Sequence, residues 1–128
     1  MKMILLTITF VAALSLCGFA AETSAKSGKL LHVVALKFKA GTNAEQIQKV
    51  ETAFRDLKKK IPQIATLEWG TNVSPEKHDK GFTHCFVLSF KSEKDRDAYL
   101  PHPEHKSFGK ILGPVLDDVF VIDFWAKE

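Results

Sequence analysis

The sequence predicts an α+β domain whose elements follow the order β-α-β-β-α-β. Four short runs rich in Val, Leu, Ile and Phe have the composition of strands. Segments with apolar residues at helical spacing separate the first run from the second and the third from the fourth. Of the 128 residues, 45% are hydrophobic and 26% are charged. This ordinary globular composition excludes a disordered or collagen-like chain.

The first twenty residues have the layout of a secretory signal peptide. Lys2 is their only charged residue, and an apolar run of roughly 15 residues follows it. That run is short for a membrane span, which takes about 20 residues. Gly18 and Ala20 place small residues at positions −3 and −1 relative to cleavage after Ala20. We therefore predict that cleavage follows Ala20 and that the protein is exported, either to a periplasm or out of the cell.

The alternatives for this segment are less favoured. They are cleavage after Ala25, a retained membrane anchor, and a lipoprotein acylated on Cys17. The lipoprotein requires a small residue before the cysteine, and Leu16 stands there. After cleavage, residues 21–29 are small and polar and predict a flexible linker. The folded domain is expected to span residues 30–126, with no contact to the membrane.

Residues 30–39 predict the first strand, and their alternation places His32 among apolar residues on one face. After a glycine-containing turn, Thr42 and Glu45 match a capping box, so we expect a helix to begin there. Pro62 stops this helix. Its apolar residues at helical spacing are Ile47, Val50, Phe54, Leu57 and Ile61.

Residues 64–73 and 82–91 predict the second and third strands, joined by a polar loop. The third run alternates between apolar and polar residues, and His84 shares a strand face with three Phe residues. Trp69 and Asn72 lie toward the end of the second run. We expect Trp69 either to wall a cavity or to fill the core of a dimer.

Two short helices are expected between the third and fourth strands. Ser92 is placed to cap the first of them. His102 stands before Pro103, an arrangement typical of an N-cap followed by proline at the first helical position. The second helix then runs to residues 113–114, a Gly-Pro pair that ends it. Residues 119–125 predict the fourth strand.

This order matches the ferredoxin-like fold, a four-stranded antiparallel sheet with helices on one face. The other face of the sheet would carry aliphatic and aromatic side chains, a patch too large to leave in water. A second copy, placed sheet against sheet across a two-fold axis, would cover that patch. We therefore expect an obligate homodimer that forms a dimeric α+β barrel.

The charge pattern argues against nucleic acid as a partner. The formal net charge is only +3, and no dense basic stretch accompanies it. Lys58, Lys59 and Lys60 lie in the last turn of the first predicted helix, where cations oppose the negative end of the helix dipole. A phosphate-binding site at these lysines is the less favoured interpretation.

Four of the five histidines are candidates for one shared cavity. His32 and His84 lie on apolar strand faces, whereas His102 and His105 flank the start of the last predicted helix. Tyr99 is the only tyrosine, and a buried tyrosine hydroxyl needs a polar partner. A helix N-terminus favours the neutral form of a nearby histidine, which can then act as a base. The alternative for each strand histidine is a core residue bonded to the neighbouring backbone.

We predict neither a metal nor a cofactor. No arrangement of His, Cys or carboxylates has a recognised zinc spacing, and neither a glycine-rich phosphate loop nor a GxSxG motif is present. His102 and His105 are three residues apart, but Pro103 constrains the pair. Cys85 lies on the strand face opposite His84, which favours a structural thiol over a nucleophile.

Six segments stand in the order and spacing of a known family. They are residues 32–39, 61–62, 69–74, 81–84, 99–105 and 123–124. With these segments the chain resembles the stress-response A/B barrel domain (Dabb) family over about residues 30–125. No single segment is specific, but the ordered set is. The resemblance implies a dimeric α+β barrel.

The resemblance implies less about activity, because family members differ and a few are polyketide cyclases. In those cyclases a Tyr and the second His of a Tyr…His-Pro-x-His segment act on a linear polyketide, and a strand-one His lies in the same pocket. The resemblance thus implies catalytic roles for Tyr99, His105 and His32, with His105 as the general base. The further candidate ligand-binding residues are His84, His102, Trp69 and Asn72.

Three functions are compatible with these observations, because a fold does not decide an activity. The favoured one is an exported homodimer that binds a small hydrophobic or phenolic molecule in a pocket near His32, His84, Tyr99 and His105. The first alternative is a cofactor-free enzyme, similar to a polyketide cyclase or an isomerase, with His105 as base. The second alternative is a purely structural protein that contributes stability under stress.

Overall fold

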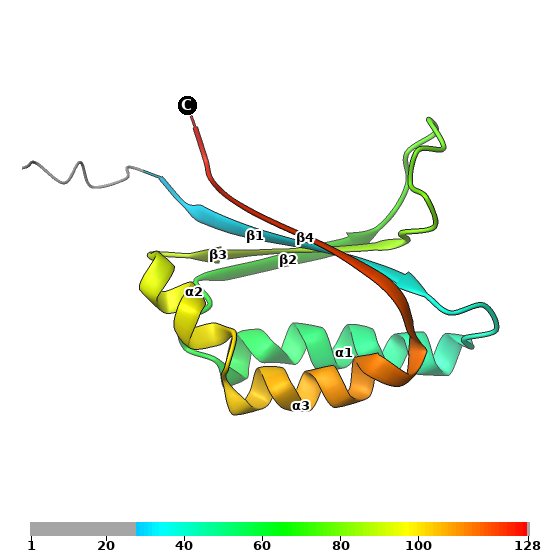
Figure 1. The fold of residues 1–128 in the computed structure, drawn as a ribbon, viewed down its shortest axis with the longest axis horizontal. Coiled ribbons are helices and arrows are strands. Elements are labelled where there is room, and N and C mark those ends of the chain that lie inside the picture. Colours follow the sequence, from blue (N-terminus) through cyan, green and yellow to red (C-terminus); the bar gives the residue numbers. More distant parts are fainter. Residues whose placement is uncertain (1–27, 128) are drawn as a thin grey trace, which may run out of the picture.

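Two layers make up residues 28–127, the part of the chain that the computed structural model describes (Figure 1). One layer is an antiparallel sheet with the strand order β2-β3-β1-β4, and the other holds the helices of this part of the chain. This arrangement confirms the predicted α+β fold of ferredoxin-like type. The elements are β1 (Leu30–Phe38), α1 (Ala44–Lys60), β2 (Thr66–Thr71), β3 (His84–Phe90), α2 (Glu93–Tyr99), α3 (Pro103–Leu112), a 3₁₀ turn η1 (Gly113–Val115) and β4 (Leu116–Trp125).

The predicted signal peptide, residues 1–20, lies outside the described residues. So does most of the predicted linker, residues 21–29, of which only the last two residues are described.

Helix α1 begins one capping position later than the sequence indicates. The predicted N-cap, Thr42, instead donates its hydroxyl to the carbonyl of Lys39 at 2.7 Å and closes the preceding turn. Asn43 caps the helix, because its Oδ1 accepts from the backbone N–H of Gln46 at 2.9 Å. The side chain of Gln46 accepts in return from the backbone N–H of Asn43 at 3.0 Å. The capping box is therefore Asn43 with Gln46, and the predicted pairing of Thr42 with Glu45 is wrong.

The caps of α2 and α3 confirm the prediction. Ser92 Oγ accepts from the backbone N–H of Asp95 at 3.1 Å, and α2 follows. His102 Nδ1 accepts from the backbone N–H of Glu104 at 3.1 Å, with Pro103 as the first residue of α3. Helix α3 lies beside α1 and runs in the opposite direction (Figure 1).

The hydrophobic core lies between the sheet and the helices. At its centre the rings of Phe54 (α1) and Phe86 (β3) stack with centroids 3.8 Å apart, and Phe108 (α3) meets Phe54 edge-on at 4.8 Å. Burying one such side chain contributes about 1.5–3 kcal/mol. The remaining buried apolar residues are Leu30, Val34, Leu36, Val50, Leu57, Ile61, Ile64, Leu88, Phe90, Tyr99, Leu112 and Val115.

The second and fourth strands differ at their ends from the predicted ranges. Strand β2 is shorter than residues 64–73, because the N–H of Ile64 donates to the carbonyl of Ile61 at 3.2 Å in a turn before the strand. Strand β4 begins at Leu116 rather than at residue 119. The 3₁₀ turn leads directly into it, and Leu116 already pairs with Phe38 of β1.

The face of the sheet that points away from the helices carries exposed apolar side chains. Phe120, Ile122 and Phe124 of β4 are 51%, 48% and 45% exposed. Leu31 and Val33 of β1 pair with residues of this set and point to the same side. None of the helices described here covers this face (Figure 1). The predicted apolar patch is therefore present, and we call its β4 and β1 residues the open face.

Candidate functional site

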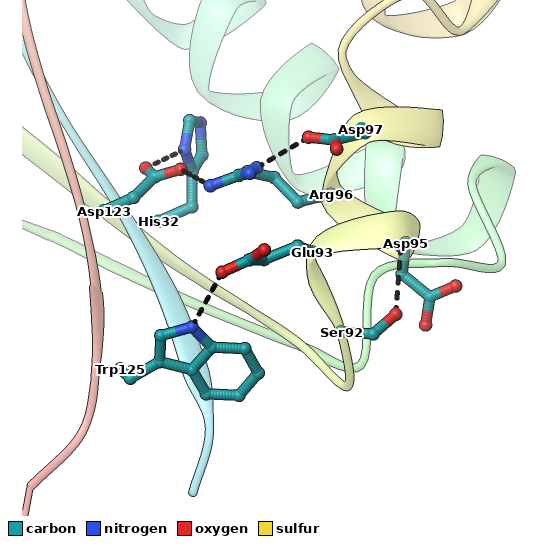
Figure 2. Close-up of polar contacts among 8 residues, drawn as sticks. All are labelled: His32, Ser92, Glu93, Asp95, Arg96, Asp97, Asp123 and Trp125. Atoms are coloured by element: carbon teal, nitrogen blue, oxygen red, sulfur yellow. Dashed lines mark hydrogen bonds and ion pairs between the residues drawn. The ribbon is translucent and has the colours of Figure 1, made fainter. Parts of the chain in front are cut away.

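Asp123 joins a strand histidine to a helix arginine at the end of the sheet nearest α2 (Figure 2). Asp123 of β4 stands opposite His32 of β1 in the strand pairing. Its Oδ1 accepts from His32 Nδ1 at 2.6 Å, and its Oδ2 accepts from Arg96 Nη1 at 3.0 Å. Arg96 also donates from Nε to Asp97 at 3.0 Å. The side chain of His32 is only 6% exposed, so this charged network reaches from the surface into the core layer.

Tyr99 and His105 lie against this network. Tyr99 ends α2 and is 1% exposed. Its ring centroid lies 5.7 Å from that of His32 and 4.4 Å from that of His105. Phe90 of β3 lies beside both His32 and Tyr99, at 6.2 and 5.2 Å between ring centroids. The structure thus brings together the three residues to which the resemblance gives catalytic roles. We call His32, Arg96, Tyr99, His105 and Asp123 the His32 cluster.

The hydrogen bonds decide which nitrogen of each imidazole carries a proton. Carboxylate and carbonyl oxygens only accept, so His32 Nδ1 donates to Asp123. For the same reason His105 Nδ1 donates to the carbonyl of Leu100, at 2.9 Å. Each ring, when neutral, then presents Nε2 as a hydrogen-bond acceptor. Two imidazoles and a phenol in an apolar layer can therefore hold a molecule that carries a hydroxyl or a carbonyl, or move a proton to and from it.

Tyr99 is expected to ionise well above the ordinary range of a tyrosine. Burial raises the pKa of Tyr99, and the negative charge of Asp123 adds to the increase. The unfolded chain ionises at about pH 10, so the folded protein should lose stability as the pH rises above that value. Tyr99 is the only tyrosine, so the ultraviolet absorbance of tyrosinate reports this residue alone. Asp123→Asn should lower the midpoint, and a midpoint of about 10 in the folded wild type would contradict the assignment.

His84 does not join the His32 cluster, which corrects the predicted pocket near all four residues. His84 pairs with Leu36, four residues along β1 from His32, a separation of about 13 Å. Its Nε2 donates to Glu51 Oε1 at 2.9 Å, and its Nδ1 accepts from the hydroxyl of Thr83 at 2.8 Å. Both ring nitrogens are thus bonded, which is the arrangement of a core histidine with its polar groups satisfied.

The other candidate ligand-binding residues are also apart from the His32 cluster. Trp69 lies on the helix side of β2, stacked at 5.5 Å on Phe86, so it does not fill a dimer core. Asn72 follows β2, and its Oδ1 accepts from the N–H of Ser74 at 3.0 Å. His84 and Asn72 border a groove of about 320 Å³ at this end of the sheet. His102 is occupied in capping α3.

Three residues of these polar networks were missed at the sequence level: Asp123, Arg96 and Glu51. Asp123 interrupts an apolar strand, residues 119–125, and this carboxylate in an apolar run was the available signal. The fold places β1 beside β4, which would have suggested a partner for His32. Arg96 and Glu51 lie on polar helix faces with many other charged residues, so no local pattern distinguishes them.

Residues 28–127 contain neither a cluster of metal-ligating side chains nor a membrane-spanning helix. Within residues 28–127, no group of three or more His, Cys, Asp and Glu side chains is placed to hold a metal ion. No helix in that range is long and apolar enough to cross a membrane. Cys85 is exposed on the sheet face away from the helices, and partial burial raises the pKa of its thiol.

The fold and the buried polar cluster define a ferredoxin-like α+β domain with a candidate site between its sheet and its helices. The chain belongs to the stress-responsive A/B barrel domain (Dabb) family, whose model matches residues 30–126. The stress-response A/B barrel domain-containing protein HS1 of Arabidopsis thaliana is 34% identical over 97 residues, which cover 76% of this chain and 89% of that protein. Olivetolic acid cyclase of Cannabis sativa is 26% identical over 97 residues, with 76% and 96% covered.

Solved structures of similar chains have the same fold. At3g17210 from Arabidopsis thaliana superposes with a TM-score of 0.73 at 32% identity, covering 77% of this chain and 96% of that one. A protein from Bacteroides fragilis, described as dimeric and ferredoxin-like, has a TM-score of 0.64 at 26% identity, covering 77% and 97%. These likenesses agree with the two-layer arrangement described above.

Proposed function

We propose that this protein is an exported homodimer that binds a small apolar molecule carrying a hydroxyl or carbonyl group. One observation carries the proposal: the His32 cluster places two imidazoles and a phenol in a layer otherwise built of apolar side chains. Apolar surroundings with a few convergent polar groups are typical of small-molecule sites.

The apolar part of the ligand would lie along β4. Val121 and Val119 precede Asp123 on the same face of the strand, the face that also carries His32 and Val34 in β1. His32 and Val34 are buried, but Val119 and Val121 remain 43% and 50% exposed. An apolar stripe therefore leads to the His32 cluster, and a ligand with an apolar tail and a polar head would match it.

The open face supports the homodimer. Its aromatic and aliphatic side chains are about half exposed in one protomer, and such a patch normally marks a protein contact. A second copy presents the same patch, so a two-fold axis buries both at once. The dimeric protein of Bacteroides fragilis with the same fold is consistent with this assembly.

Native mass spectrometry of the full protein, purified gently from the exported fraction, tests these proposals together. We expect a dimer of chains that begin at residue 21, with an additional discrete mass for the bound molecule. Denaturing the same sample gives the chain mass and hence the cleavage site. A monomer would contradict the dimer. A dimer without added mass, both as purified and after incubation with lipid mixtures, would contradict ligand binding.

Acid-base catalysis is a second candidate function, favoured by the geometry of His105. Its Nδ1 donates to the Leu100 carbonyl, so Nε2 is the nitrogen that can accept a proton. The imidazole ring that carries this nitrogen packs against Tyr99. The hydroxyl of Tyr99, whose pKa is raised by burial, is protonated at neutral pH and can donate to an oxygen that gains negative charge. Olivetolic acid cyclase is a relative whose name records a cyclisation.

The proton transfer has a direct test that needs no natural substrate. In D₂O, the methyl protons of acetophenone should exchange for deuterium faster in the presence of the protein, because His105 takes a proton from carbon and Tyr99 stabilises the enolate. His105→Gln should lower the protein-dependent rate by about 100-fold or more. His78→Gln, in the exposed loop before β3, should not change it. Equal rates in both variants would exclude His105 as the base.

A further inference from the structure

A second cleft lies at the edge of the molecule between α1 and β2. Strand β2 is an edge strand of the sheet, at the side opposite β4 and the His32 cluster. The cleft has a volume of about 350 Å³. Its lining residues are Thr52, Arg55, Asp56, Lys58, Lys59, Leu67 and Trp69. These residues combine an apolar floor from the strand with a polar, mostly basic wall from the helix.

Trp69 forms a rigid aromatic surface in this cleft. Its ring is nearly parallel to those of Phe86 and His84, with centroid distances of 5.5 and 6.4 Å and interplanar angles of 11°. Phe86 is fully buried and His84 is held by Glu51, so the support beneath the indole is fixed. The guanidinium carbon of Arg55 lies 5.7 Å from the Trp69 ring centroid. This guanidinium therefore lies over the indole ring in a cation–π contact, at an exposed position of α1.

The charge of the cleft is positive and partly uncompensated. Of its cations, Lys59 approaches Asp56 at 3.6 Å. Arg55 and Lys58 make no ion pair with any of residues 28–127. Elsewhere the structure pairs its only other described arginine, Arg96, with two carboxylates. Two cations beside an indole therefore remain available to an anionic ligand.

We propose that this cleft is a second binding site and that it takes an aromatic carboxylate. The ring of the ligand takes the place of the Arg55 guanidinium over Trp69. The exposed Arg55 side chain then turns outward and binds the carboxylate together with Lys58, with Arg55 able to contact both oxygens. An inorganic phosphate fits less well, because it would leave the indole and Leu67 in water. This site is separate from the His32 cluster and goes beyond the ligand proposed there.

Indole N–H signals in a ¹H–¹⁵N NMR spectrum of the whole protein provide the test. The chain has two tryptophans, and Trp69→Phe identifies which signal belongs to Trp69. Should that variant fail to fold, Trp125→Phe identifies the other signal. Titration with 2-naphthoate should shift the Trp69 signal in a saturable manner and leave that of Trp125, at the far edge of the sheet, unchanged. The neutral analogue 2-naphthamide and inorganic phosphate should each bind at least about tenfold more weakly.

A charge-matched pair of variants separates specific binding from general attraction. Arg55→Gln with Lys58→Gln should weaken 2-naphthoate binding about tenfold or more. Lys49→Gln with Lys110→Gln removes the same charge from a different groove and should have little effect. The proposal is overturned if 2-naphthoate shifts both indoles alike, if 2-naphthamide binds as well, or if the two double variants weaken binding equally. None of these results depends on the ligand of the His32 cluster.

Discussion

Ile122→Lys is expected to convert the proposed dimer into a monomer. Ile122 lies in the middle of the open face, between Phe120 and Phe124 on the same strand, and pairs with Val33 of β1. In a two-fold interface each dimer would bury two lysines at equivalent positions. Taking an unpaired ammonium out of water costs several kcal/mol, and this cost arises twice in each dimer, so the substitution opposes association strongly. Light scattering coupled to size-exclusion chromatography would report the molar mass.

Val73→Lys is the matched control for that experiment. Val73 is 90% exposed and follows β2, away from the open face. The same substitution there should leave the molar mass of a dimer and the unfolding midpoint unchanged. A dimer that survives Ile122→Lys would show that another surface holds the two copies together. Circular dichroism would confirm that the variant retains its fold.

The element order could be predicted because its signals are local. Each strand is a short run rich in β-branched and aromatic residues, and Ser92 and His102 cap the helices that follow them. The cap of α1 shows the limit of such signals. Thr42 with Glu45 and Asn43 with Gln46 have the same spacing, so the sequence offers two boxes. The bond from the Thr42 hydroxyl to the carbonyl of Lys39 belongs to the turn and decides between them.

The candidate site could be predicted only in part, for a geometric reason. Alternation indicates which residues share a face, and it placed His32 and His84 each among apolar residues. Which face meets the helices came only from the structure, where both histidines are buried on the helix side. It does not give the register between strands. The pairing of His84 with Leu36 separates the two histidines along the sheet. Asp123 illustrates the same limit, because its contact with His32 depends on the pairing of β1 with β4.

Phe54→Ala is expected to cause a large loss of stability. Phe54 is 1% exposed and its ring packs against those of Phe86 and Phe108, with centroids 3.8 and 4.8 Å away. The substitution removes the stacked ring and leaves a cavity that packed neighbours fill only in part. Substitutions of this type cost about 3–5 kcal/mol. Each kcal/mol corresponds to a decrease of about 4–8 °C in Tm for a domain of this size.

The measurement should use thermal unfolding at a fixed protomer concentration, because the Tm of a dimer depends on concentration. Gln48→Ala, at an exposed position of the same helix, should change the free energy of unfolding by no more than about 0.5 kcal/mol. The result also bears on where a ligand can lie. If Phe54→Ala lowers the free energy of unfolding by about 3–5 kcal/mol, the aromatic rings fill the space between β3 and the helices. The proposed ligand would then lie along the apolar stripe of β4. If the substitution costs little, the centre of the layer is loosely packed, and the ligand site would have to be moved there.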